Sequence, residues 1–149
     1  MKLHTTVVLL ATLFLGCSLP GIYVIEDPLS AHQHNDLGFI YEKQGHLDLA
    51  EKEYGLAARR DKNWAVPHFN LGNVYFKTGN YQRAKSHYRQ ALRRDPENPD
   101  VMNNLAYVLY KQGDQEEAEK WINRALSIRI SEEYLHTKEK IQSGKSESN

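Results

Sequence analysis

A regular spacing of small and large apolar residues constrains this chain more than any other feature of its sequence. Over most of the 149 residues, positions that lie 34 apart carry similar side chains in three consecutive copies, without an insertion. The matching positions are Leu37, Leu71 and Leu105; Gly38, Gly72 and Ala106; Gly45, Gly79 and Gly113; Ala50, Ala84 and Ala118; Tyr54, Tyr88 and Ile122; and Ala57, Ala91 and Ala125. A period of this length indicates one supersecondary unit per copy, with a core shared between neighbours. The sequence therefore predicts three units, at residues 31–64, 65–98 and 99–132.

Each unit is predicted to consist of two helices joined by a turn. A glycine that follows Lys-Gln or Lys-Thr can adopt the left-handed conformation that ends the first helix. These glycines are Gly45, Gly79 and Gly113. Gly38 and Gly72 fall inside the first helix, where glycine costs ~1 kcal/mol relative to alanine. The expected compensation is a close approach of the second helix, which presents Ala50 or Ala84.

This pattern resembles the tetratricopeptide repeat, a 34-residue unit with Leu-Gly and tyrosine in its first helix. The chain departs from the family at a few positions. Lys62 and Ile130 stand where the family has proline, and His34, His68 and Met102 replace a tryptophan. The resemblance implies an all-α protein, a right-handed α-solenoid of three helix-turn-helix units with a C-terminal capping helix.

The end of the array is predicted to carry a polar cap, as repeat arrays require. Ser131 can cap a helix at residues 133–142, whose side chains Tyr134, Leu135 and Ile141 would cover the third repeat. Residues 143–149 (SGKSESN) are small and polar, which is typical of a disordered tail.

The resemblance also implies that the first helices line a concave groove for an extended peptide. The candidate groove residues are Asn35, Phe39, Asn70, Asn73, Phe76, Asn103, Asn104, Tyr107 and Tyr110. An asparagine offers an acceptor and two donor hydrogens, which suit a peptide backbone, and aromatic rings could hold alternate side chains. Two alternatives stay open. The asparagines could be solvated helix surface, and Phe69 and Tyr107 could belong to the core between repeats.

One chaperone-binding subclass of the family uses a clamp of lysine, arginine and asparagine for the terminal carboxylate of a peptide. The corresponding positions of this chain are Asn35, Phe39, Asn70, Asp100 and Asn104. The basic members of the clamp are missing, so the sequence predicts no carboxylate clamp.

The first residues of the chain are typical of a signal peptide. Lys2 precedes an apolar stretch over residues 5–15 that is too short to cross a bilayer, and Gly16 and Cys17 follow. Leu-Gly-Cys resembles the lipobox of bacterial lipoproteins, although Phe14 and Leu15 depart from its usual residues. The resemblance implies removal of residues 1–16 and acylation of Cys17, followed by a tether over 17–30. Cleavage near Ser18 or Pro20, or a buried N-terminal helix, are the alternatives.

Two features refine this expectation. Ser18 rather than aspartate follows the cysteine, which by analogy with lipoprotein sorting favours the outer membrane, with the protein facing the periplasm. The apolar run Ile22-Tyr23-Val24-Ile25 would either pack on the first repeat or occupy the groove as a tethered pseudo-ligand.

Charge is balanced overall but uneven along the chain. Nineteen lysine and arginine residues match nineteen aspartate and glutamate residues, which argues against a basic nucleic-acid binder. The second helix of repeat two is basic, and its candidate contacts for an anionic surface are Arg83, Lys85, Arg89 and Arg93. The simpler expectation is a solvated face with ion pairs to Glu116, Glu117 and Glu119, each worth ~1 kcal/mol or less.

Catalytic chemistry has no recognisable motif in this sequence. Its single cysteine excludes a disulfide within the chain and a cysteine-based metal cluster, and no phosphate loop, nucleophile elbow or zinc motif occurs. The prediction is a non-enzymatic, lipid-anchored interaction module without metal or cofactor, acting as an adaptor or assembly factor for an envelope complex. The alternatives are a self-associating envelope protein, hence a homo-oligomer, and a binder of anionic lipid or cell-wall polymer through its convex face.

Overall fold

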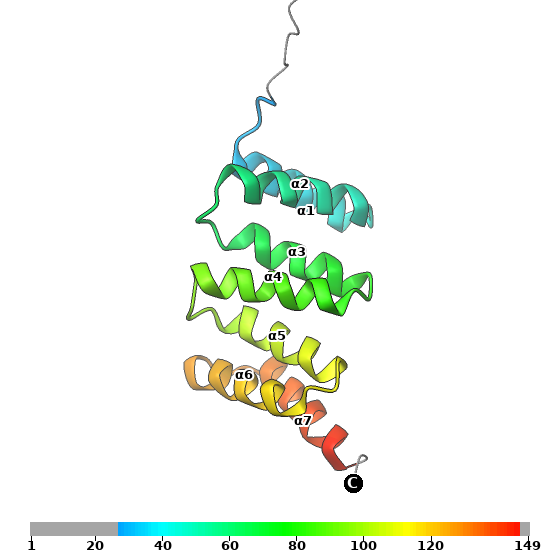
Figure 1. The fold of residues 1–149 in the computed structure, drawn as a ribbon, viewed down its shortest axis with the longest axis vertical. Coiled ribbons are helices and arrows are strands. Elements are labelled where there is room, and N and C mark those ends of the chain that lie inside the picture. Colours follow the sequence, from blue (N-terminus) through cyan, green and yellow to red (C-terminus); the bar gives the residue numbers. More distant parts are fainter. Residues whose placement is uncertain (1–26, 147–149) are drawn as a thin grey trace, which may run out of the picture.

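A computed structural model describes residues 27–146, which form seven helices and no strand (Figure 1). The helices are α1 (Ala31–Lys43), α2 (Leu47–Arg60), α3 (Val66–Lys77), α4 (Tyr81–Arg94), α5 (Pro99–Lys111), α6 (Gln115–Ile128) and α7 (Glu132–Ser146). The helices pack as the pairs α1–α2, α3–α4 and α5–α6, and the pairs stack in chain order with α7 on α6 and α5. The predicted all-α solenoid with a terminal helix is confirmed.

The turns within the three pairs follow the glycine pattern of the sequence. Gly45, Gly79 and Gly113 have φ values of 82°, 75° and 80°, which confirms the left-handed conformation. The helix starts use side-chain caps at several points. Ser30 forms a capping box with Gln33 at the start of α1, and Ser131 Oγ accepts a hydrogen bond from the Tyr134 amide in α7.

The glycines inside the first helices lie against tyrosine rings. A Cβ atom at Gly38 would lie 2.7 Å from the Tyr54 ring, and one at Gly72 would lie 2.3 Å from the Tyr88 ring. The expected close approach of the second helix is therefore confirmed, but the atoms nearest to the glycines belong to Tyr54 and Tyr88 rather than to Ala50 and Ala84. In the third repeat Ala106 replaces the glycine and Ile122 replaces the tyrosine. In each repeat a small residue of the first helix is thus combined with a large residue of the second helix. Where the small residue is larger, in repeat three, the large residue is smaller.

The core of the first two repeats contains polar pairs. His34 is 1% exposed, and its Nδ1 lies 2.7 Å from the Glu53 carboxylate. At the equivalent positions of the next repeat, His68 Nδ1 lies 3.3 Å from His87 Nδ1. Burial and, next, the nearby Arg94 guanidinium lower the pKa of His68 to about 4, so this imidazole is neutral at pH 7.

The segment before α1 is attached to the first repeat through Asp27. Its carboxylate lies 2.9 Å from His34 Nε2, so that the buried imidazole stands between Asp27 and Glu53. Arg60, at the end of α2, donates a hydrogen bond to the backbone carbonyl of Asp27. The chain therefore enters the array at a fixed point that contacts both helices of repeat one.

The terminal helix differs from the expectation in two ways. It continues to Ser146 beyond the predicted end at Gln142, so residues 143–146 are helical rather than tail. Tyr134 and Ile141 are buried as expected, whereas Leu135 is 50% exposed and does not cover the third repeat. Residues 147–149 lie outside the described part.

Residues 1–26 also lie outside the described residues, and with them the predicted signal peptide, Cys17 and the apolar run at 22–25. Among the described helices, none is long and apolar enough to span a bilayer. The same part of the chain brings together no group of three or more potential metal-ligating side chains.

Candidate functional site

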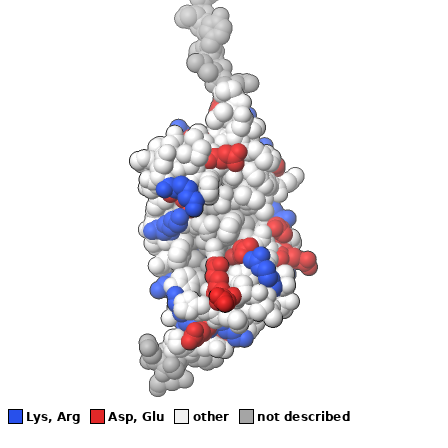
Figure 2. Space-filling view, turned by 180° about the vertical axis from the view of Figure 1, so that it is seen from behind, with Lys and Arg blue, Asp and Glu red and all other residues white. Residues whose placement is uncertain are grey.

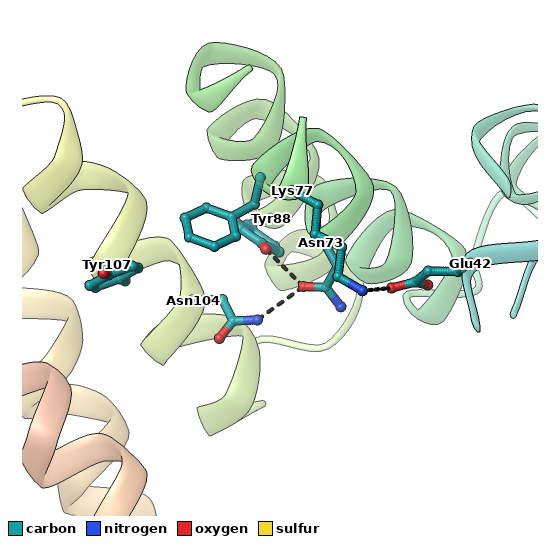
Figure 3. Close-up of a pocket in the computed structure, with 7 residues that line it drawn as sticks. Glu42, Asn73, Lys77, Tyr88, Asn104 and Tyr107 are labelled. Atoms are coloured by element: carbon teal, nitrogen blue, oxygen red, sulfur yellow. Dashed lines mark hydrogen bonds and ion pairs between the residues drawn. The ribbon is translucent and has the colours of Figure 1, made fainter. Parts of the chain in front are cut away.

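A cavity opens on the side of the first helices, at the centre of the array. Its volume is about 250 Å³, and we call it the central cavity. Its lining side chains come from three repeats and are Glu42, Asn73, Phe76, Lys77, Tyr88, Asn104 and Tyr107 (Figure 3). The 34-residue period explains this convergence, because equivalent positions of α1, α3 and α5 lie side by side in the stack.

The polar part of the central cavity is organised around Asn73. Its Oδ1 accepts a hydrogen bond from the Tyr88 hydroxyl at 2.8 Å and another from Asn104 Nδ2 at 3.0 Å (Figure 3). Burial above all, with the Glu42 carboxylate in addition, raises the pKa of Tyr88 above its usual range, so its hydroxyl stays a donor. Within the described residues, the Asn73 amide nitrogen donates to no acceptor. The network therefore fixes the side chain with both amide hydrogens available to a ligand.

The charges of Glu42 and Lys77 cancel, so the residues that line the central cavity have no net charge. The Lys77 ammonium lies 2.7 Å from Glu42 Oε1, and the Tyr54 hydroxyl donates to Glu42 Oε2 at 2.7 Å. Burial and this hydrogen bond raise the pKa of Tyr54 above its ordinary range. Both carboxylate oxygens are thus engaged, and the cavity presents amides and rings rather than a net charge.

The aromatic wall continues from the cavity along the groove. Phe76 and Tyr107 pack edge to face with centroids 5.6 Å apart, and Tyr107 and Tyr110 are 6.1 Å apart. All three rings are half-buried, so each combines packing between repeats with an accessible face. Phe69 also packs on the core, where its ring lies beside Tyr88, as one of the alternatives held. Phe39 is 52% exposed and lies at the first-repeat end.

The asparagines do not form one ladder. Asn70 Nδ2 donates to Asn35 Oδ1 at 2.9 Å, which links α3 to α1 in a second amide pair beside the network of Asn73. Asn103 is 3% exposed and turns toward α7, where its Nδ2 donates to Glu133 at 3.3 Å. Asn103 is therefore a nearly buried part of the groove wall where α7 meets α5, and it lines the hollow between these helices.

The terminal helix adds residues that the repeat pattern does not predict. A second hollow shares Phe76, Asn104 and Tyr107 with the central cavity and is completed by α7. The residues that it gains from α7 are Glu133, His136, Thr137 and Lys140. The groove is thus continuous from the first repeat to the terminal helix.

The basic side chains of α4 are partly used within the molecule. Arg89 Nη2 lies 2.7 and 2.8 Å from the two carboxylate oxygens of Glu117, which confirms one expected ion pair. Arg83 lies over the Tyr75 ring, with 5.3 Å between the guanidinium carbon and the ring centroid. Glu116 pairs with Lys120 of its own helix instead of with α4. Lys85 and Arg93 form no ion pair within the described residues.

Comparison with known proteins agrees with this architecture. A family model described as "Tetratricopeptide repeat" matches residues 28–97, and another with the same description matches residues 69–133. No curated protein sequence matches the chain.

Two solved structures are similar in fold. One is the first TPR of Spaghetti (RPAP3) bound to the HSP90 peptide SRMEEVD, with a TM-score of 0.76, 22% identity, and coverage of 83% of this chain and 98% of that chain. The other is the Arabidopsis OM64 TPR domain, with a TM-score of 0.74, 14% identity, and coverage of 77% and 96%. Helix pairs stacked at a 34-residue period, matched by these repeat models and folds, show that the chain carries tetratricopeptide repeats.

Proposed function

We propose that this chain is a non-enzymatic interaction module that binds an extended segment of another protein in its concave groove. The observation that carries the proposal is the central cavity, where the unused amide hydrogens of Asn73 lie beside the accessible rings of Phe76 and Tyr107. An extended peptide offers carbonyl oxygens to such donors and alternate side chains to such rings. A cavity of about 250 Å³ has room for one large side chain.

The same proposal includes an anchor and an address. Acylation of Cys17 would attach the module to a membrane of the cell envelope. The favoured site is the outer membrane, with the protein facing the periplasm. Its support is the sequence Leu15-Gly16-Cys17 after a short apolar stretch. An anchored repeat array with an open groove fits an adaptor or assembly factor, which holds a partner near the membrane.

Replacing Asn73 with aspartate tests the groove with little change of shape. The new side chain keeps an acceptor for Tyr88 and Asn104 but replaces the two donor hydrogens with a carboxylate oxygen. A photo-crosslinking residue at Phe39, a candidate groove position that is 52% exposed, would report the partner in intact envelopes. We expect at least a tenfold lower yield of crosslinked partner in the Asn73→Asp variant, because peptide carbonyl oxygens would lose their donor and meet a negative charge.

The matched control is Lys85→Gln on α4, which changes the net charge by the same amount on the opposite face. It should leave the yield unchanged. Equal yields from wild type and Asn73→Asp would rule out the groove as the binding surface. A crosslinked product of twice the chain's mass would instead favour the self-associating alternative.

The anchor is tested by replacing Cys17 with serine. We expect the wild-type protein to sediment with membranes, because several acyl chains on Cys17 would anchor it stably. The Cys17→Ser variant lacks the residue that would carry these chains, so we expect it to be at least tenfold depleted from the membranes. Mass spectrometry of the mature N-terminal peptide is the direct measurement. An unmodified cysteine, or an N-terminus near Ser18 or Pro20, would contradict the anchor and leave the groove proposal standing.

A further inference from the structure

Cations line one edge of the groove because each first helix ends in a lysine. These residues are Lys43, Lys77 and Lys111. Seen from behind, basic side chains lie along the left edge of the molecule, and acidic side chains gather in the lower middle and on the right (Figure 2). Lys77 is neutralised by Glu42 at 2.7 Å. The edge is therefore not uniformly positive, and the cations beyond the central cavity determine its local charge.

Two lysines from different helices converge on one ring. The Lys111 ammonium, at the end of α5, lies 5.4 Å from the centroid of Tyr107, and the Lys140 ammonium of α7 lies 5.3 Å from the same centroid. We call Lys111 and Lys140 the lysine pair. Among the described side chains, neither forms an ion pair with a carboxylate. Contact with the ring holds the ammonium groups in place without neutralising them.

The lysine pair adjoins the central cavity. Tyr107, whose ring contacts both ammonium groups, also lines the central cavity. Lys140 lines the second hollow, which shares Phe76 and Asn104 with the central cavity. The ring of Tyr107 therefore lies between the neutral, aromatic part of the groove and its positive part. An extended chain advances about 3.3 Å per residue, so two side chains bound at these places belong to neighbouring or next-but-one residues.

We infer that the groove binds a segment in which a large apolar or aromatic residue lies one or two positions from an aspartate or glutamate. The apolar side chain occupies the central cavity, and the side-chain carboxylate binds the ammonium groups of the lysine pair around Tyr107. This inference rests on the proposed function and names the class of its ligand. It differs from recognition of a terminal carboxylate, since the carboxylate belongs to a side chain within the segment.

The test uses synthetic nonapeptides with an acetylated N-terminus and an amidated C-terminus, so that only side chains supply carboxylates. A tryptophan is fixed at the centre of a glycine-serine background, and one glutamate is placed one to four residues to either side. Fluorescence anisotropy measures binding to the wild-type protein. We expect peptides with glutamate one or two residues from tryptophan to bind at least tenfold more tightly than the peptide without glutamate.

The double variant Lys111→Gln and Lys140→Gln should lose that gain while it still binds the peptide with tryptophan alone. The control variant, Lys85→Gln and Lys120→Gln, removes two lysines that line neither the central cavity nor the second hollow, and it should keep the gain. Circular dichroism on heating should give the same curve for all three proteins.

The outcomes separate the inference from the proposed function. A wild-type protein that binds the tryptophan peptide without preference for glutamate, or a gain that survives in the lysine-pair variant, would overturn the inference alone. If no peptide of the set binds at millimolar concentration, the proposed function fails, and the inference fails with it.

Discussion

Replacing Gly72 with alanine is expected to lower the free energy of unfolding by about 2 kcal/mol, although alanine is the better helix former. The added Cβ would lie 2.3 Å from the ring of Tyr88, and this ring cannot move aside easily. Tyr88 is 1% exposed, and its hydroxyl donates a hydrogen bond to Asn73 at 2.8 Å. Urea unfolding followed by circular dichroism measures the difference.

Two variants separate this clash from other effects of the substitution. Tyr88→Ile in the Gly72→Ala background recreates the Ala106–Ile122 combination of repeat three, so the double variant should recover about 1 kcal/mol or more relative to the sum of the single changes. Gly55→Ala is the matched control, because its Cβ would meet only the Arg59 guanidinium at 3.5 Å. We expect this control to stabilise the protein by about 0.5–1 kcal/mol. Equal destabilisation by Gly72→Ala and Gly55→Ala would contradict the role of the ring.

Stability is expected to fall by about 2 kcal/mol as the pH is lowered from 6.5 to 4, through the contribution of His68. The unfolded chain binds a proton on this residue below its usual pKa of 6.5, whereas the folded protein does so only near the lowered value of about 4. Between these values the unfolded state binds more protons, so acidification favours it. Arg93, Arg94 and His87 face the imidazole and add to its burial in opposing protonation.

The variant His68→Met gives the comparison, because Met102 occupies the equivalent, fully buried position of repeat three. Urea midpoints at pH 7, 6, 5 and 4 should fall less steeply in this variant than in the wild type. Titrating groups remote from position 68, such as Asp27, contribute equally to both proteins. Parallel curves would show that His68 is protonated as readily in the folded state as in the unfolded state.

The repeating part of the structure is the part that the sequence predicts best. Gly45, Gly79 and Gly113 mark turns because a positive φ is a local requirement that favours glycine at that position. The stacking of the helix pairs follows from the same period, since a unit that recurs without insertion must contact its neighbours in a recurring way. Local backbone preference and periodicity therefore determine the fold together.

The contacts within and beyond the repeats are less predictable. The pattern identified Gly72 as a small residue but not Tyr88 as the ring that fills its space, because spacing along the chain does not say which side chain of the facing helix meets it. The burial of Asn103 and the contribution of Lys140 depend on how α7 packs on α5, and α7 lies outside the period. A repeat register describes only surfaces that every unit shares, so the end of the groove had to be seen in three dimensions.

The attachment of Asp27 has a mechanical consequence. A tensile load applied through the residues before Asp27 would reach repeat one at His34 and at Arg60, which belong to α1 and α2 respectively. The load would be shared between the two helices as shear, rather than peeling α1 from its end one turn at a time. Protonation of the Asp27 carboxylate would weaken this attachment, so the force that the array withstands should depend on the acidity of its surroundings.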